Sequence, residues 1–302
     1  MIKLDQVSKQ FGPFRAVDNL SFSVSAGEVL GFLGPNGAGK TTTMKIITGF
    51  LAPTSGSIEL FGQSLPKDGL KAKEMIGYLP EGAPAWGDMS VCGFLRFIAE
   101  LRGYKGAQRD ERVAQVVESL ELTQVFERTI ETLSKGFKRR VGLAQALIHD
   151  PKILILDEPT DGLDPNQKFK VRELIRNLSK DKIVIISTHI LEEVNALCSR
   201  VIMIADGKLV SDATPAELEA QSDYHQAVTV RFSSAIDPQQ KLQQLSNVTR
   251  IEAADGCFTL LSTPGNSVLE DVKQLAEQEN WDIAELYIEK GRLDDVFRKL
   301  TT

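Results

Sequence analysis

The sequence has little cysteine and no long apolar run. Its 302 residues include three cysteines, Cys92, Cys198 and Cys257, and no two of them lie at metal-ligand spacing. A disulfide scaffold and a cysteine-based metal site are therefore not expected, and the thiols are interpreted as reduced, small apolar side chains. The longest stretch without Asp, Glu, Lys or Arg covers 14 residues, Gly256–Leu269. A membrane-spanning helix needs about 18 or more apolar residues, so the sequence predicts no such helix.

The sequence also lacks a secretion signal and an excess of positive charge. Asp5 and Lys9 lie where a signal peptide has its apolar core, which favours a cytoplasmic location. The net charge is −6. Residues 1–221 carry 27 basic and 28 acidic side chains, whereas residues 222–302 carry 8 and 13. Neither part has the basic excess of a nucleic-acid-binding protein, so no nucleic-acid partner is expected.

The chain does contain the alternation of an α/β domain. Short apolar runs at Glu28–Leu33, Ile153–Leu156 and Ile183–Ile186 are typical of buried parallel strands. The segment Gln167–Leu178 between the last two runs has a helical pattern, and a mostly helical insertion is predicted over residues 85–150. Together these segments predict an α/β sheet with a helical subdomain.

The length predicts two domains, and 42% apolar residues suffice for a core in each. The segment Val201–Thr214 is typical of a hairpin around Asp206-Gly207, and it would close a first domain of residues 1–221. Residues 222–302 follow the order β-α-β-β-α-β-α, which predicts a small α+β ferredoxin-like domain. This second domain shows no catalytic constellation. Its acidic residues are interpreted either as a solvated face or as a regulatory or dimer-contact surface.

A phosphate-binding loop is predicted between the first apolar run and the helix that follows it. Residues 34–41 match the pattern G-x-x-x-x-G-K-[ST]. Glycines let backbone N–H groups turn inward around phosphate oxygens, and the following helix presents its positive end. Lys40 is expected to contact the β- and γ-phosphates and the Thr41 hydroxyl to bind Mg²⁺, the alternative being a purely structural turn. The predicted binding residues are Gly34, Pro35, Asn36, Gly37, Ala38, Gly39, Lys40, Thr41 and Thr42.

Three further candidates follow the other two predicted strands. The apolar run at Ile153 ends in two adjacent carboxylates, which repel each other unless a cation or a helix N-terminus compensates. Asp157 suits a Mg²⁺ shell, and Glu158 suits the general base that polarises the attacking water. Alternatively, Glu158 only favours the start of a following helix. His189 follows the next run, at the end where ligands collect in such sheets, although a lone histidine there is more often structural.

The segment LSKGFKRR at residues 133–140 opens a predicted helix, with Ser134 as its N-cap. Cations at the positive end of a helix are unfavourable, and an anion such as an ATP phosphate would resolve the conflict. We expect Ser134 and Gly136 to contact phosphate. Arg139 and Arg140 are left open between phosphate contact, a solvated face and contact with acids of a partner.

The motifs GPNGAGKT, LSKGF, ILILDEPT, GLDP and STHILEE, in this order, resemble those of the nucleotide-binding subunit of an ABC transporter over residues 1–221. The resemblance implies an ABC-type P-loop ATPase fold and hydrolysis of ATP with Mg²⁺. It also implies a head-to-tail dimer around two ATP molecules, formed with a second copy or a paralogous ATPase. The dimer would drive a separate integral membrane permease and lie peripherally on the inner face of the membrane.

The resemblance also implies roles for individual residues. Glu158 and His189 would be catalytic, and Asp164 of the GLDP motif would lie at the dimer interface. Phe11 matches the aromatic residue that stacks on adenine, although core packing of Phe11 is a competing interpretation and Phe14 is a second candidate.

Two departures from the family pattern stand out. Lys135 and Phe137 replace a glycine and a glutamine of the usual LSGGQ signature, while Ser134 and Gly136 are kept. Glu81 stands where most relatives have glutamine, so it is carried over as a coupling-loop residue near ATP and as a metal-binding candidate. The LSKGF signature, the segment IGYLPE and the C-terminal end LDDVFRKLT resemble those of ATPases from drug-efflux, sodium-export and gliding-motility exporters, whose permeases are separate subunits. A soluble ABC ATPase acting on ribosomes or DNA is the alternative.

Overall fold

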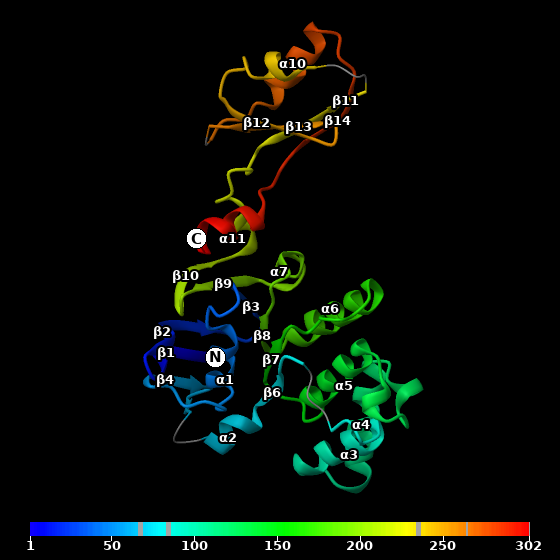
Figure 1. The fold of residues 1–302 in the computed structure, drawn as a ribbon. Helices are drawn as coiled ribbons and strands as arrows, with labels where there is room; N and C mark the ends of the chain where they lie inside the picture. The colour runs from blue at the N-terminus through cyan, green and yellow to red at the C-terminus, as the bar shows by residue number, and fades with distance from the viewer. Residues whose placement is uncertain (66–68, 83–85, 234–236, 264, 302) are drawn as a thin grey trace. The chain divides into compact units, whose positions relative to one another are not determined.

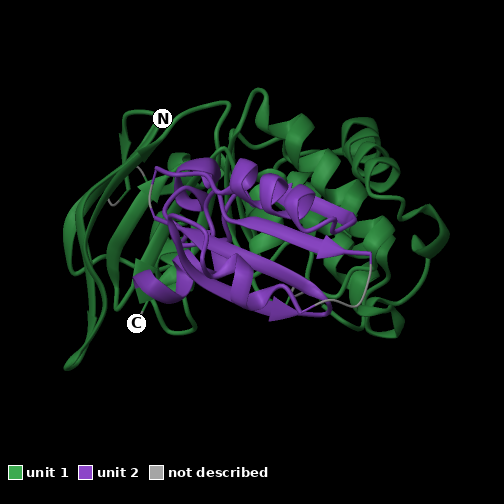
Figure 2. Ribbon diagram, turned by 90° about the horizontal axis from the view of Figure 1, so that it is seen from above, with its two compact units in different colours: residues 1–214, 301 green, residues 215–300, 302 purple. Residues whose placement is uncertain are grey.

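The structure is a computed structural model that describes residues 1–65, 69–82, 86–233, 237–263 and 265–301. The chain divides into two compact units, residues 1–214 with 301 and residues 215–300, which Figure 2 distinguishes. The described residues contain no helix that is both long and apolar enough to cross a membrane. Ala85, the first residue of the predicted helical subdomain, and Thr302, the last of the predicted second domain, lie outside the described residues.

The first unit is organised around a six-stranded sheet in which all strands but one are parallel (Figure 1). Its strands in spatial order are β10 (Lys208–Ala213), β9 (Arg200–Ala205), β3 (Val29–Leu33), β8 (Ile183–Ser187), β7 (Ile153–Asp157) and β6 (Ile76–Leu79). The strands β3, β7 and β8 are buried along their whole length, as expected for strands made mostly of apolar residues. The hairpin β9–β10 turns at Asp206-Gly207, both with positive φ, so the predicted turn is confirmed.

A second, antiparallel sheet packs against this one. Its strands in spatial order are β2 (Phe14–Val24), β1 (Ile2–Phe11), β4 (Ser55–Leu60) and β5 (Gln63–Ser64). One hydrophobic core joins side chains of both sheets and of α1 (Lys40–Ile47). At its centre the rings of Phe22 and Phe32 meet edge to face, with centroids 5.4 Å apart. This core holds the loop between β3 and α1 on a rigid base.

The helices of the first unit connect these strands. Between β6 and β7 lie α3 (Val91–Leu101), α4 (Gly106–Ser119) and α5 (Lys135–Leu147), with two short 3₁₀ turns at Thr123–Val125 and Ile130–Thr132. The other helices are α2 (Gly69–Glu74), α6 (Pro165–Ser179) and α7 (Leu191–Leu197).

The second unit is a four-stranded antiparallel sheet with helices, preceded by α8 (Pro215–Glu219). The elements follow the predicted order: β11 (Val228–Phe232), α9 (Gln239–Leu242), β12 (Val248–Ala254), β13 (Cys257–Ser262), α10 (Leu269–Gln278), β14 (Ile283–Ile288) and α11 (Leu293–Thr301). The strand order β12-β13-β11-β14 is that of a split β-α-β sandwich, with a core formed by one sheet face, α9 and α10.

Candidate functional site

The loop from Gly34 to Gly39 connects β3 to α1, and the Lys40 side chain packs against the first residues of this loop. The Lys40 ammonium donates to the carbonyls of Gly34, at 2.7 Å, and Pro35, at 3.0 Å, and the residue is only 9% exposed. Burial lowers the pKa of Lys40, and nearby carboxylates, Glu158 first, oppose the shift. Carbonyls are weaker partners for an ammonium than phosphate oxygens. A phosphate bound in the loop would therefore replace the two carbonyls as the partner of the Lys40 ammonium.

Two glycines of the loop lie against backbone from other strands. A Cβ on Gly34 would stand 2.3 Å from the Ile204 carbonyl oxygen, and one on Gly39 would stand 2.4 Å from that of Ala16. Gly39 also has a φ of +103°, which a side chain rarely adopts. The sequence pattern therefore needs glycine at both positions for space, and at Gly39 for conformation as well.

The metal candidates Thr41 and Asp157 face each other across the sheet edge. Thr41 Oγ1 lies 3.4 Å from Asp157 Oδ2, and the Ser187 hydroxyl donates to Asp157 Oδ1. Within the described ranges no three acidic, histidine or cysteine side chains converge on a common point. Mg²⁺ in a nucleotide site takes one or two protein oxygens and completes its shell with phosphate and water, and Thr41 and Asp157 are the residues that would hold it here. Glu81, on the loop after β6, is exposed and adds its negative charge to this region.

Glu158 and His189 meet at the ends of the neighbouring strands β7 and β8. His189 Nδ1 lies 2.8 Å from Glu158 Oε1. Burial raises the pKa of Glu158, and the His189 hydrogen bond works against the rise. The backbone of Glu158 has a φ of +53°, so it does not begin a helix. The alternative that Glu158 only starts a helix is therefore wrong, and the carboxylate points to its histidine partner instead.

The signature residues form a second group with the GLDP segment. Ser134 caps α5, and its hydroxyl accepts from the Phe137 N–H at 3.4 Å. Asp164 caps α6, and its carboxylate accepts from the Gln167 N–H at 2.9 Å. A Cβ on the buried Gly136 would stand 2.7 Å from Gln167 Oε1. The starts of α5 and α6 thus pack closely, so the exposed capping residues Ser134 and Asp164 begin neighbouring helices and Gly136 is enclosed where they meet.

Arg139 and Arg140 are both buried, 5% and 6% exposed, so their interpretation as a solvated face is wrong. Arg139 donates to the backbone carbonyls of Pro80, Asp157 and Glu158. Arg140 donates to the carbonyl of residue 120 at 2.9 Å. Both guanidinium groups therefore compensate carbonyl dipoles of their own chain.

Phe11 and Phe14 pair across the β1–β2 turn and are 45% and 59% exposed. Core packing of Phe11 is therefore wrong. The Lys9 ammonium lies 5.2 Å from the Phe11 ring centroid.

The sequence reasoning missed a buried acid behind the site. Glu193 on α7 is 1% exposed and accepts hydrogen bonds from Thr160 and, at 3.0 Å, from Thr188. Burial raises the pKa of Glu193. Thr160 follows Glu158 by two residues and Thr188 precedes His189, so Glu193 ties together the two segments that carry the candidate catalytic pair. The signal was the polar pair Ser187-Thr188 at the end of an apolar strand.

Comparison with known proteins gives this geometry a family. The family profile described as ABC transporter matches residues 17–161. The Nod factor export ATP-binding protein I of Paraburkholderia xenovorans is 33% identical over 302 residues, covering 99% of this chain and 96% of that protein. The chain belongs to the ABC transporter ATP-binding family.

Other relatives agree on this ABC family. The probable multidrug ABC transporter ATP-binding protein YbhF of Escherichia coli is 37% identical over 223 residues, which are 74% of this chain. The present chain spans 38% of the length of YbhF. The linearmycin resistance ATP-binding protein LnrL of Bacillus subtilis is 36% identical over 72% of this chain and 70% of its own length.

Solved ABC cassettes share the fold. The dimeric structure of the bacterial cassette MJ0796 superposes with a TM-score of 0.66 at 25% identity, covering 71% of this chain and 99% of that one. A post-hydrolysis state of the same cassette with ADP and phosphate gives a TM-score of 0.65 at 26% identity, over the same shares of the two chains. The predicted family and ABC-type ATPase fold are thereby confirmed.

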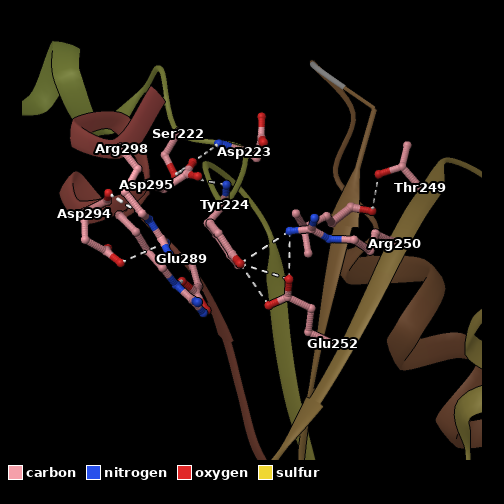
Figure 3. Close-up of polar contacts among 12 residues, drawn as sticks. Ser222, Asp223, Tyr224, Thr249, Arg250, Glu252, Glu289, Asp294, Asp295 and Arg298 are labelled. Atoms are coloured by element: carbon pink, nitrogen blue, oxygen red, sulfur yellow. Dashed lines mark hydrogen bonds and ion pairs between the residues drawn. The ribbon is translucent and has the colours of Figure 1, made fainter. Parts of the chain in front are cut away.

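The second unit of this ABC protein carries a dense polar network (Figure 3). The Tyr224 hydroxyl lies 2.9 Å from both carboxylate oxygens of Glu252, and Arg250 bridges the pair. Asp295 accepts from Ser222 and from the Asp223 N–H. A cavity of about 590 Å³ opens beside this network. The hydrogen bonds of Asp295 join the chain at the start of the second unit, residues 222–223, to α11 near its end.

Proposed function

We propose that this chain is the ATP-hydrolysing subunit of an ABC exporter, closing with a second copy or a paralogous ATPase around two ATP molecules to drive a membrane permease. The observation that carries the proposal is the convergence of five side chains on one sheet edge: Lys40, Thr41, Asp157, Glu158 and His189. Phosphoryl transfer requires charge neutralisation, a metal ligand and a water-positioning base in one place.

Each group would have a distinct part in hydrolysis. Lys40 binds the β- and γ-phosphate oxygens, and the loop N–H groups surround them. Thr41 and Asp157 would hold Mg²⁺, which neutralises charge on the phosphates when bound. Glu158 orients the attacking water and accepts its proton, for which a raised pKa is favourable. His189 holds the Glu158 carboxylate in place and faces solvent, where it can donate to the γ-phosphate.

The second copy would complete each site through its signature helix. Ser134 and Lys135 are exposed at the positive end of α5, where a phosphate would stabilise the helix. Asp164 caps the neighbouring helix α6, whose start packs against that of α5. The cassette MJ0796, which shares this fold, forms a dimer in its solved structure.

The permease would dock on an apolar cavity of the first unit. Phe50 and Leu101 are 76% and 65% exposed, and with Tyr78 and Pro80 they line a cavity of about 540 Å³. Exposed apolar patches of this kind mark protein interaction sites. Pro80 also binds Arg139 of the catalytic edge, so the patch is connected to the site. Attachment to a permease would place the protein on the inner face of the membrane, and export is favoured because relatives are named for export or resistance.

The catalytic part of the proposal is tested with purified protein, Mg²⁺ and ATP. We expect slow hydrolysis, and Glu158→Gln should lose it while trapping an ATP-bound dimer in gel filtration. Glu192→Gln, which changes an exposed acid on α7, is the matched control and should keep wild-type turnover. Unchanged turnover in Glu158→Gln would contradict the assignment of the base.

The transport part is tested by fractionating cells. Phe50→Glu and Leu101→Glu should release the protein from membranes and leave hydrolysis by the purified protein intact. Phe61→Glu, which changes an exposed aromatic residue on another loop, should not release the protein from membranes. Sedimentation of the wild-type protein with ribosomes, and its absence from membranes, would favour the soluble alternative instead.

A further inference from the structure

Arg139 joins the signature helix to two segments of the catalytic edge. It lies in the second turn of α5, and its guanidinium is almost fully enclosed. One terminal nitrogen donates to the Pro80 carbonyl at 2.9 Å, and the other donates to the carbonyls of Asp157 and Glu158. A single side chain thus holds the end of β6, the end of β7 and α5 together.

The contact falls on a backbone that needs support. Glu158 has a φ of +53°, a conformation that is sparsely populated by residues with a side chain and persists only when surrounding contacts enforce it. Its N–H donates to the Ser187 carbonyl at 3.0 Å, and its carboxylate is held by His189. The Glu158 carbonyl accepts from the Asp161 N–H at 3.1 Å and from Arg139, whose guanidinium also binds the preceding carbonyl of Asp157. Loss of Arg139 removes the side-chain contact that ties these two carbonyls to α5.

The charge of Arg139 also suits its surroundings. Burial lowers the pKa of Arg139, and the carboxylates of Asp157, Asp161, Glu158 and Glu81 oppose that shift in decreasing order. A buried guanidinium is tolerated when it is paired and hydrogen-bonded. Here it offsets the negative charge that gathers around the candidate metal site.

We propose that Arg139 is a positioning residue for ATP hydrolysis, which holds Glu158 in its working conformation and ties it to Pro80 and to α5. The inference rests on the proposed function. Because α5 is capped by Ser134, which would contact the ATP of the partner subunit, Arg139 connects engagement of that ATP to the placement of Glu158. The Pro80 contact extends the same connection to the apolar cavity proposed for the permease.

Arg140 provides a matched control. It is the next residue of the same helix and is equally enclosed, at 6% exposed. Its guanidinium donates to the Leu120 carbonyl, lies 3.8 Å from the Glu121 carboxylate and 4.3 Å from the Phe137 ring centroid, and these three contacts lie within the helical insertion. Loss of either arginine removes one buried guanidinium from α5, but only the change at Arg139 removes a contact to the backbone of Glu158.

The first test compares Arg139→Gln with Arg140→Gln in the full-length protein. We expect Arg139→Gln to lower kcat by on the order of 10- to 100-fold, the effect of misplacing a catalytic group by about 1 Å. Binding of ATP, measured with a fluorescent ATP analogue, should change by less than about threefold, because Lys40 and its loop are untouched. Arg140→Gln should lower thermal stability to a similar extent but reduce kcat much less. Equal losses of kcat in the two variants would overturn the proposal.

The second test asks whether Arg139 acts through Glu158. Arg139→Gln should trap an ATP-bound dimer in gel filtration, and adding it to Glu158→Gln should give no further loss of single-turnover rate. A further loss in the double variant, or a failure to form the dimer, would overturn the proposal while leaving Glu158 as the base. If Glu158→Gln alone keeps full turnover, the proposed function fails instead. Arg139→Lys, which keeps the charge, serves for the same comparisons if Arg139→Gln does not fold.

Discussion

The two glycines at positions 37 and 39 of the phosphate loop offer a direct test of how the loop is held. Both have positive φ, +82° and +103°. A Cβ on Gly37 would meet no atom within 4 Å, whereas a Cβ on Gly39 would stand 2.4 Å from the Ala16 carbonyl oxygen on β2. The substitutions Gly37→Ala and Gly39→Ala therefore share the conformational change and differ in the contact.

The expected magnitudes follow from this difference. Forcing alanine into a positive φ costs about 1–2 kcal/mol at either position. The lower entropy of the unfolded chain returns about 0.4–1 kcal/mol to both variants. Gly39→Ala must also displace a backbone carbonyl, and overpacking of this kind costs about 1–3 kcal/mol. We expect Gly39→Ala to lose about 1–3 kcal/mol more of the free energy of unfolding than Gly37→Ala.

Urea unfolding without nucleotide measures the difference. The chain has two tryptophans, Trp86 in the first unit and Trp281 in the second. In a Trp281→Phe background, Trp86 fluorescence reports the first unit alone, which avoids averaging two transitions. Equal losses for Gly37→Ala and Gly39→Ala would refute the argument that packing against β2 fixes the loop.

Three more predictions concern the site. Glu158 acts as a base when ionised and its pKa is raised, so kcat should fall on acidification at a pH above the range of an ordinary glutamate. His189→Ala removes a hydrogen bond that lowers the pKa of Glu158, so in a pH–rate profile this variant should lose activity at still higher pH. Glu193→Leu should leave two buried hydroxyls without an acceptor and lower the free energy of unfolding by about 2–6 kcal/mol in urea titration, with a smaller loss for Glu193→Gln. Phe11→Ala should weaken binding of a fluorescent ATP analogue by about 1–3 kcal/mol, and a loss confined to Phe14→Ala would assign the adenine stack to that ring.

The central strands could be predicted because burial on both faces leaves an unbroken apolar sequence. Ile153–Asp157 and Ile183–Ser187 differ from the predicted ranges by one residue at the carboxyl end. That extra residue is polar in both strands, so an apolar pattern stops before it. The strands of the second unit could also be predicted from the sequence, because they are short and separated by polar turns.

The amino-terminal antiparallel sheet could not be predicted in the same way. On β1 the buried residues are Ile2, Leu4 and Val7, so the two-residue period breaks after Leu4. The register shifts between Leu4 and Val7, where Gln6 takes a positive φ. Such bulges remove the alternation that identifies a half-buried strand.

Contacts between residues that are far apart along the chain could not be predicted from the sequence either. Arg139 and Pro80 are 59 residues apart, and Thr160 and Glu193 are 33 apart. The cluster of cations after Ser134 indicated an anion, yet the structure pairs the two arginines with carbonyl oxygens of the same chain. Composition near a helix end reports an electrostatic need but not which group meets it.

The strand order explains why the candidate groups can act together. β8 lies between β3 and β7, so the phosphate loop and Glu158 start from strands about 10 Å apart, at two strand spacings. Ser187 on β8 is paired in register with Phe32 on one side and Asp157 on the other, which brings all three strands to the same level. In the proposed function this spacing leaves room for a phosphate and an attacking water between loop and base. His189 follows β8, the strand between the loop and the base. Displacement of any one of the three strands would therefore disturb the metal ligand and the base together.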